Sequence, residues 1–165
     1  SSMDRIDDKI LALLQNDGRM PNKQLASAVG LAPSSCLERV RRLQEKGIIK
    51  GFQATVEPNL LGIGLQAFVA VRLAKHSRDV VSTFRDHIIK LPEVVAVYHL
   101  AGQEDFIVHV AVRDADHLRN LTLDAFTTRT EVSRLTTSLV YEYIQSERLP
   151  NFNIIGETIK PKVIR

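Results

Sequence analysis

Three arginines and two serines lie close together in the first third of the chain, at spacings that allow them to bind DNA. An Arg guanidinium can hold guanine or a phosphate through two hydrogen bonds, and a Ser hydroxyl near the start of a helix can reach a base edge or a phosphate. If the stretch is a helix, its outer face can enter a major groove. The same mixture of Glu and Arg also occurs on helix faces that meet only water. The predicted DNA-contacting residues are Ser34, Ser35, Glu38, Arg39, Arg41 and Arg42.

A second group of polar residues lies in the connection between two predicted strands, residues 100–105. Gly102 would let the backbone approach a small ligand closely, and the carboxylates of Glu104 and Asp105 can hold an ammonium group. Hydroxyls from the last predicted strand could add hydrogen bonds. A glycine beside acidic residues is also typical of an ordinary solvated turn, and that alternative stays open. The predicted ligand-contacting residues are Leu100, Ala101, Gly102, Gln103, Glu104, Asp105, Thr136, Thr137 and Ser138.

No pattern in the sequence indicates catalysis or a metal site. The five histidines have no metal-ligand spacing, and the single Cys36 excludes an intramolecular disulfide and a cysteine zinc cluster within one chain. We interpret Cys36 as a small packing residue of a helix rather than as a redox switch. The sequence also lacks a phosphate-binding glycine loop, a nucleophile elbow and an HExxH motif. We therefore predict no enzymatic activity, no metal and no cofactor.

Two short helices that meet at Gly30 are predicted to position the DNA-facing residues. Glycine can adopt the positive φ of such a turn, Pro33 suits the first turn of the second helix, and Gly47 marks its end. Residues 4–15 form a further amphipathic helix, so that three helices can bury their inner faces together. The inner face of the second helix of the pair is predicted to consist of Leu37, Val40 and Leu43.

The periodicity of apolar residues changes after these helices. Residues 48–56 are predicted as a short wing and an exit strand, and residues 57–64 contain Pro and Gly that interrupt helical and strand patterns alike. A strand, a helix, two strands, a helix and a strand then follow, over residues 66–74, 79–91, 94–100, 106–112, 115–126 and 136–144. This order predicts a ferredoxin-like antiparallel sheet with both helices on one face.

The predicted fold class is α+β, with an N-terminal winged helix-turn-helix and a C-terminal ferredoxin-like βαββαβ domain. Because the uncovered face of the sheet is too apolar for water, we expect a second copy of the chain to cover it. Coverage by residues 151–165 of the same chain is the alternative. The predicted segments are the helix-turn-helix domain 4–51, the linker strand and hinge 52–64, the ferredoxin-like domain 65–148 and the tail 149–165.

Composition agrees with a protein that needs more than one copy to hold DNA. The 165 residues are 44% hydrophobic and carry a formal net charge of +3. The first 50 residues hold nine Lys and Arg against six Asp and Glu. This basic excess is mild, so productive DNA binding is expected to need at least a dimer. No stretch is long and apolar enough for a membrane span or a signal-peptide core, and we expect a cytoplasmic protein.

Taken together, these motifs resemble the Lrp/AsnC family of bacterial and archaeal transcription regulators. The resemblance covers about residues 4–148. It rests on Asp4 and Asp7 with the apolar helix after them, on LASAVGLAPSSCLERVRRLQEKGIIKGFQA, and on Gly102-x-x-Asp105 followed by Asp114. In that family a ferredoxin-like domain forms dimers and often octamers and binds small effectors, typically amino acids. By this resemblance the DNA-facing positions are Ser34, Ser35, Arg39 and Arg42, and the effector-loop motif is Gly102 and Asp105.

The resemblance implies a sequence-specific DNA-binding transcription regulator whose assembly or DNA affinity is changed by a small effector, an amino acid. Its expected partners are double-stranded DNA, the effector and further copies of the chain in a homodimer that assembles to an octamer, with no membrane. The expected location is the cytoplasm, in association with the nucleoid. Many family members have an aromatic residue where this chain has Glu104, which adds a negative charge to the loop. The alternative is a ferredoxin-like small-molecule-binding or enzymatic domain whose helical extension does not read DNA.

Overall fold

The computed structural model describes residues 3–154, and the chain divides into two compact units. Unit 1 comprises residues 1–55 and 144–165, and unit 2 comprises residues 56–143. The chain therefore crosses from unit 1 to unit 2 and back again. Each unit has its own cluster of buried apolar side chains, which is the basis for describing the two units separately.

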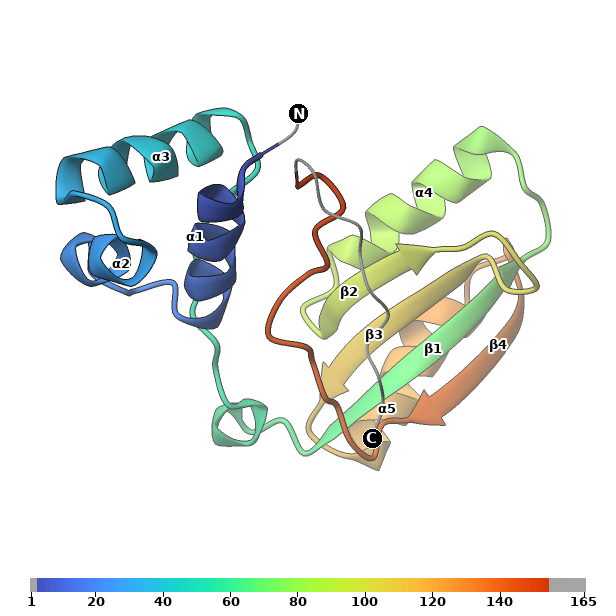
Figure 1. Ribbon diagram of the computed structural model, residues 1–165. Coiled ribbons are helices and arrows are strands. Elements are labelled where there is room, and N and C mark those ends of the chain that lie inside the picture. Colours follow the sequence, from blue (N-terminus) through green and yellow to red (C-terminus); the bar gives the residue numbers. More distant parts are fainter. Residues whose placement is uncertain (1–2, 155–165) are drawn as a thin grey trace, which may run out of the picture. The chain divides into compact units, whose positions relative to one another are not determined.

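Unit 1 contains the three predicted helices, α1 (Arg5–Asn16), α2 (Asn22–Val29) and α3 (Pro33–Glu45) (Figure 1). Asp4 caps α1, because its side chain accepts a hydrogen bond from the Asp7 N–H at 2.8 Å. Gly30 ends α2 at φ 71°, where a residue with a Cβ would be strained. Pro33 occupies the first turn of α3, as the sequence predicts. The helix-turn-helix is thereby confirmed.

The inner face of α3 differs from the prediction at one residue. Leu37, predicted to face inward, is 59% exposed, whereas Cys36 is completely buried. Cys36, Val40 and Leu43 follow the i, i+4, i+7 spacing of one helix face, and Leu37 is rotated by about 100° from Cys36. Both rotations of the helix would give an apolar stripe, so periodicity alone could not choose between them. Burial raises the pKa of the Cys36 thiol, in keeping with its role as a packing residue.

The predicted wing does not form as a strand. Residues 48–57 carry no strand in the structure, and no β-strand of the described chain lies in unit 1. The N–H groups of Ile48 and Ile49 both donate to the Leu43 carbonyl, which closes the end of α3 instead of starting a hairpin. Phe52 then lies against Gly18, where an added Cβ would stand 3.1 Å from its ring. A short 3₁₀ turn, η1 (Pro58–Leu61), follows in unit 2.

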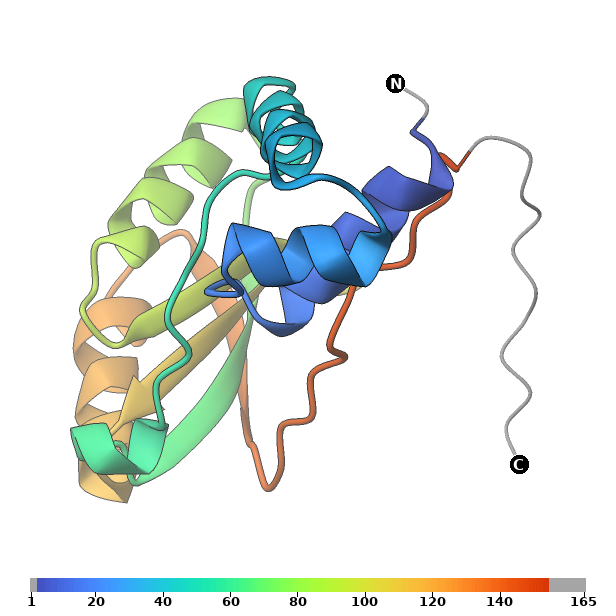
Figure 2. The same cartoon turned by 60° about the vertical axis from the view of Figure 1, so that its left-hand side comes forward.

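Unit 2 is the predicted four-stranded antiparallel sheet with both helices on one face (Figure 2). The strand order is β2-β3-β1-β4, which confirms the ferredoxin-like arrangement. The helix α5 continues into a short π-helical turn, η2. The elements are β1 (Leu65–Leu73), α4 (Arg78–Ile89), β2 (Val94–His99), β3 (Phe106–Val112), α5 (Ala115–Leu121), η2 (Thr122–Thr127) and β4 (Val132–Leu139).

The last strand begins and ends earlier than the predicted 136–144. In β4, Val132 pairs with Leu73 and Leu139 pairs with Ala67 of β1. Since β1 starts only at residue 65, little backbone remains for residues beyond 140 to pair with. The length of β4 is thus set by its partner strand, although the sequence TTSLVYEYI has the composition of a longer strand.

The two faces of the sheet differ in burial. Along β1, Ala67, Val69, Val71 and Leu73 are buried against the helices. The opposite face is half-buried and mixes apolar and polar groups, with the Phe68 and His109 rings 5.1 Å apart. This face is less apolar than the sequence predicts. On β1, β2 and β3, the half-buried and exposed residues of this face include Gln66, Phe68, Ala70, Tyr98, Ile107, His109 and Ala111.

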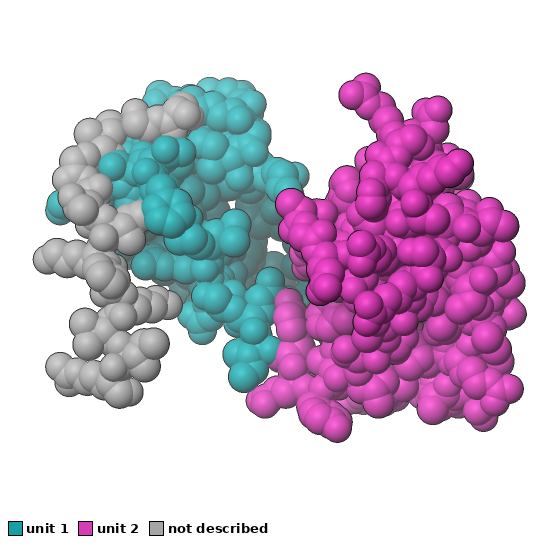
Figure 3. Space-filling view, turned by 90° about the vertical axis from the view of Figure 1, so that its right-hand side faces the viewer, with its two compact units in different colours: residues 1–55, 144–165 teal, residues 56–143 magenta. Residues whose placement is uncertain are grey.

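The described end of the chain returns to unit 1 (Figure 3). There the Leu149 N–H donates to Gln15 of α1 at 3.0 Å, and the Asn151 amide donates to Asp8 of α1 at 2.9 Å. Met3 N–H also donates to the Asn153 carbonyl at 3.0 Å. Residues 151–154 are therefore held by unit 1. The remainder of the predicted sheet-covering tail, residues 155–165, lies outside the described residues.

Candidate DNA-binding helix and effector loop

The start of α3 offers an anion-binding end. Its N-cap residue is Ala32, whose side chain has no hydrogen-bond acceptor, and Pro33 follows at the first helical position. The next N–H groups belong to Ser34 and Ser35, and both residues are exposed. The first N–H groups of a helix have no partner within the helix and attract negative charge. This end of α3 therefore suits a DNA phosphate.

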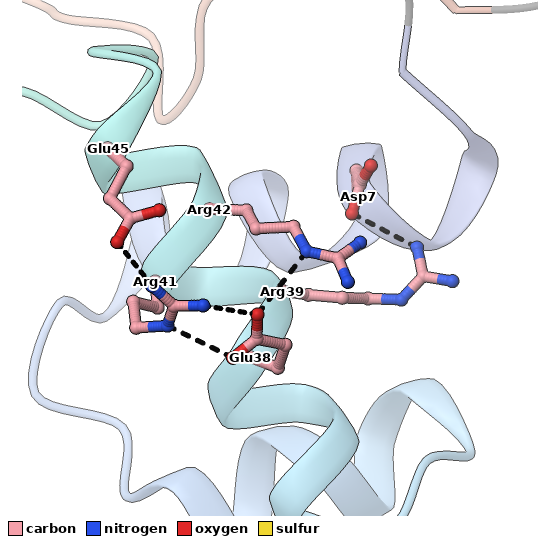
Figure 4. Close-up of polar contacts among 6 residues, drawn as sticks. All are labelled: Asp7, Glu38, Arg39, Arg41, Arg42 and Glu45. Atoms are coloured by element: carbon pink, nitrogen blue, oxygen red, sulfur yellow. Dashed lines mark hydrogen bonds and ion pairs between the residues drawn. The ribbon is translucent and has the colours of Figure 1, made fainter.

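The middle of α3 carries a chain of ion pairs on its exposed face (Figure 4). Arg41 donates to Glu38 at 3.0 Å and also pairs with Glu45, and Arg42 lies 3.4 Å from Glu38. The hydrogen bonds from Arg41 lower the pKa of Glu38, so this carboxylate stays charged. The side chains of Arg41 and Arg42 are 54% and 63% exposed. Both can exchange an exposed carboxylate for a phosphate at little cost, because surface ion pairs are weak.

Arg39 points elsewhere than its two neighbours. Its Nη1 atom lies 2.6 Å from Asp4 Oδ2 and 3.1 Å from Asp7 Oδ1, so it joins α3 to the start of α1. Only 28% of its side chain is exposed. The hydrogen bond from Arg39 holds the pKa of Asp4 below its ordinary value. Of the three predicted arginines, the structure thus leaves Arg41 and Arg42 on the open face and places Arg39 between two helices.

Sequence reasoning missed the partners of Arg39 and the exposure of Leu37. Asp4 is the N-cap of α1 and Asp7 lies in its first turn, where carboxylates are stabilised by the helix dipole without any further partner. Their three-residue spacing on one helix face also fits a shared cationic partner, which was the available signal. The identity of that partner depends on how α1 and α3 pack.

The predicted ligand loop is a tight connection between β2 and β3. The Leu100 N–H donates to the Asp105 carbonyl at 2.9 Å, and the Asp105 N–H donates to the Val71 carbonyl of β1 at 2.9 Å. Gly102 lies between them at φ 148°, a conformation that side chains rarely allow. The loop is therefore fixed at both ends and glycine-dependent in the middle.

The carboxylate of Asp105 already has protein partners. Its Oδ2 atom accepts a hydrogen bond from the Leu73 N–H at 2.7 Å and lies 3.1 Å from Nε2 of His76. The neighbouring Glu104 differs, because its Oε2 atom is buried without a hydrogen-bond partner among the described residues. An unpaired buried carboxylate oxygen is costly, so a ligand N–H at this atom would remove a penalty. His76 was not predicted; the pairing of β1 with β3 brings it to the loop.

The predicted hydroxyl residues of β4 do not converge on this loop. Thr136 pairs with Ala70 in the middle of β1, so β1 separates it from β3 and its loop. Cross-strand partners share a face of the sheet. Thr137, opposite the buried Val69, therefore faces the helices, whereas Thr136 and Ser138 face the other side. Within one chain, the loop is joined by residues 71–76 rather than by the β4 hydroxyls.

The described chain has no group of three or more His, Cys, Asp or Glu side chains placed to hold a metal ion. None of its helices has the length and apolar character needed to cross a membrane.

Both units match known domains. Residues 3–44 match the AsnC-type helix-turn-helix domain, and residues 66–150 match the Lrp/AsnC ligand binding domain. The HTH-type transcriptional regulator AldR of Mycolicibacterium smegmatis is 44% identical over 143 residues, which are 87% of this chain and 84% of AldR. The leucine-responsive regulatory protein of Escherichia coli K12 is 37% identical over 148 residues, 89% of this chain and 90% of that protein.

A solved structure shares the fold across both units. A transcriptional regulator from Neisseria meningitidis, crystallised as an L-Met complex, superposes with a TM-score of 0.82 at 31% identity. The match covers 88% of this chain and 94% of the Neisseria chain.

Proposed function

This chain belongs to the Lrp/AsnC family of transcription regulators, and from that premise we propose that α3 is the helix with which it reads the major groove of DNA. Its matched relatives are regulators, so the alternative of an enzymatic domain with a helical extension is set aside. The observation that carries the proposal is the open face of α3, where Arg41 and Arg42 stand beyond an uncapped helix start with Ser34 and Ser35.

Different side chains on this face suit different parts of the DNA. Ser34 and Ser35 at the helix start suit a phosphate or a base edge, and Arg42 can reach guanine or phosphate with two N–H groups. Glu38 tethers both exposed arginines in the free protein and can accept from a cytosine amino group when they turn to DNA. In this proposal Arg39 does not contact DNA. It supports binding indirectly, because its ion pairs with Asp4 and Asp7 fix the position of α3.

Removal of Arg42 tests the proposal directly. A duplex selected from random DNA by the full chain serves as the probe, and anisotropy at one fixed salt concentration gives the affinity. Arg42→Ala should weaken binding by about 1–3 kcal/mol if Arg42 contacts a base. The matched control is Arg85→Ala, which removes an exposed arginine of α4 in unit 2 and should bind like the wild type. Equal affinities of Arg42→Ala and wild type would mean that α3 does not read DNA.

We also propose that unit 2 binds an amino acid at the Leu100–Asp105 loop. The support is the fixed loop with Gly102, the two carboxylates beside it, and the L-Met complex of the Neisseria relative. An α-ammonium group would find Asp105 and the unpaired Glu104 oxygen within the same short loop. Effector binding can alter DNA binding only if the ligand favours one state, typically by about 1–3 kcal/mol.

The assembly proposed for this chain is a homodimer that builds an octamer. A dimer would cover the half-buried sheet face around Phe68 and would set two α3 helices about 34 Å apart on a pseudo-palindromic site. Two copies would also add to the mild positive charge of one helix-turn-helix. As a DNA-binding regulator it would act in the cytoplasm, in association with the nucleoid.

A further inference from the structure

Leu37 is an apolar side chain on the face of α3 that otherwise carries charges and hydroxyls. It is 59% exposed, and it is absent from the buried cluster of unit 1 and from the side chains packed against it. The smaller Cys36 fills the core position instead. Single exposed apolar residues are common on protein surfaces, so exposure alone assigns Leu37 no role, and its position on the helix decides what it can contact.

The position of Leu37 on α3 identifies the surface it belongs to. Residues three and four apart lie next to each other on a helix, so Leu37 adjoins Ser34 on one side and Arg41 on the other. These three side chains form one row along the open face of α3, starting at the helix N-terminus. The row is continuous with the DNA-binding surface proposed above.

The charges around Leu37 limit what else it could do there. Arg41 pairs with Glu38 and Glu45, and Arg42 with Glu38, so the charged groups of this face are mutually compensated in the free protein. A partner that displaces these carboxylates must be anionic, which a DNA backbone is. Inside the major groove, the apolar group available to a leucine is the C5-methyl of thymine.

We propose that Leu37 is a specificity-determining residue that packs against the C5-methyl group of a thymine in each half-site. The proposal rests on α3 being the reading helix, and it adds a base preference that the arginines and serines do not supply. Leu37 selects thymine over cytosine, because cytosine presents a C–H where thymine has the methyl group. The contact is apolar and therefore adds discrimination without adding to the salt dependence of binding.

The test removes the apolar group from each side of the contact, namely the isopropyl group of Leu37 and the C5-methyl group of thymine. Full-length wild type and Leu37→Ala are titrated, at one salt concentration, with the selected duplex and with duplexes in which single thymines are replaced by deoxyuridine. Deoxyuridine lacks only the C5-methyl group. At one position in each half-site, wild type should lose roughly three- to fivefold in affinity, the effect of about one buried methyl group. Leu37→Ala should bind the thymine duplex more weakly and lose nothing further with deoxyuridine there.

Two controls separate the possible outcomes. Leu37→Ala should melt like wild type because the side chain is exposed, and Leu123→Ala, which removes an exposed leucine of unit 2, should keep the methyl dependence. A deoxyuridine effect of equal size in wild type and Leu37→Ala at every position overturns the proposal, as does no effect in either. A change in the oligomer mass of Leu37→Ala, measured by light scattering, also overturns the proposal, since Leu37 would then lie between copies of the chain. If one of these outcomes is found while Arg42→Ala binds DNA more weakly than wild type, α3 reads DNA and only the proposed role of Leu37 is wrong.

Discussion

The arginines of α3 are three residues of one type within four positions, yet they meet different partners. Arg41 and Arg42 keep to the exposed face with Glu38, whereas Arg39 reaches Asp4 and Asp7 at the start of α1. A guanidinium that donates to two carboxylates holds two helices in one orientation. At the scale of single residues, α3 therefore carries two exposed arginines, which are proposed to contact DNA, and one arginine that joins α3 to α1.

Loss of the Arg39 ion pairs should destabilise unit 1 in a pH-dependent way. Arg39→Ala is expected to lower the free energy of unfolding by about 1 kcal/mol at pH 7, the upper range for partly exposed pairs. The pKa of Asp4 is below its ordinary value of 3.8, so its stabilising effect is complete above that pH and disappears as the pH falls through the folded-state pKa. Denaturant unfolding at pH 7 and pH 3 should show the difference between variant and wild type shrinking in acid.

Asp4→Asn provides the matched variant for that measurement. Asparagine caps a helix as well as aspartate does, so this change removes the charge and keeps the cap. Combined with Arg39→Ala, it should add little further loss. A loss in Arg39→Ala that is the same at both pH values would mean that packing of the Arg39 stem, and not the ion pair, supports α1.

The effector loop gives a second prediction for single residues. Asp105→Asn keeps an oxygen for the Leu73 N–H but leaves a bound ammonium without its counter-charge, at a cost of about 2–5 kcal/mol. Calorimetry should show amino-acid affinity falling more than tenfold, with effector-free DNA binding near that of wild type. Glu104→Gln is the companion variant, because it neutralises the carboxylate with the unpaired oxygen.

The pair of variants discriminates between the two carboxylates. Unchanged binding in Asp105→Asn together with loss in Glu104→Gln would move the ammonium contact to Glu104. A screen of all twenty amino acids in which wild type binds none would refute an amino-acid effector and leave a regulator controlled by its own concentration.

At the scale of elements, the residue type at Gly64 is determined by the backbone segment that lies next to it, at the end of β3. Gly64 was assigned to a hinge because glycine interrupts both periodicities, and it does precede β1 directly. In the structure its N–H donates to the Val112 carbonyl at 3.1 Å, and an added Cβ would overlap the Arg113 carbonyl. The position therefore requires glycine for close approach of two backbones rather than for flexibility.

Substitution of that glycine should destabilise unit 2. Gly64→Ala forces the backbone beside β3 to shift, and we expect a loss of about 1–3 kcal/mol in the free energy of unfolding. Gly51→Ala is the control, since an added Cβ there meets no atom within 4 Å and should change stability by only a few tenths of a kcal/mol. Thermal melting followed by circular dichroism measures both, and equal melting temperatures would contradict the close-approach argument.

At the scale of the whole molecule, the half-buried face of the sheet predicts association. We expect light scattering at micromolar protein to give at least twice the chain mass of 18.5 kDa. Phe68→Lys places a charge in the middle of that face, next to His109, and should dissociate the dimer while the inner core of Val69 and Val71 stays intact. A wild-type mass near 18.5 kDa would refute the dimer, and an unchanged mass in Phe68→Lys would place its interface elsewhere.

Local patterns in the sequence were enough to predict most of the architecture. Gly30, Pro33 and the capping Asp4 mark helix ends through backbone preferences that act over one turn, and the order of strands and helices specified the ferredoxin-like sheet. The family followed from the same local motifs, and the comparisons confirm it. DNA binding and a small-ligand domain were predictable for that reason.

Only the tertiary structure decided what depends on contacts between distant segments. The rotation of α3, which buries Cys36 and exposes Leu37, is set by packing against α1 and α2 and by the ion pairs of Arg39. The length of β4 is set by the end of β1, and the partners of Asp105 come from residues that only the sheet brings near. Periodicity gives each helix or strand an apolar face but neither its partner nor its exact rotation, because those are chosen by the free energy of the assembled core.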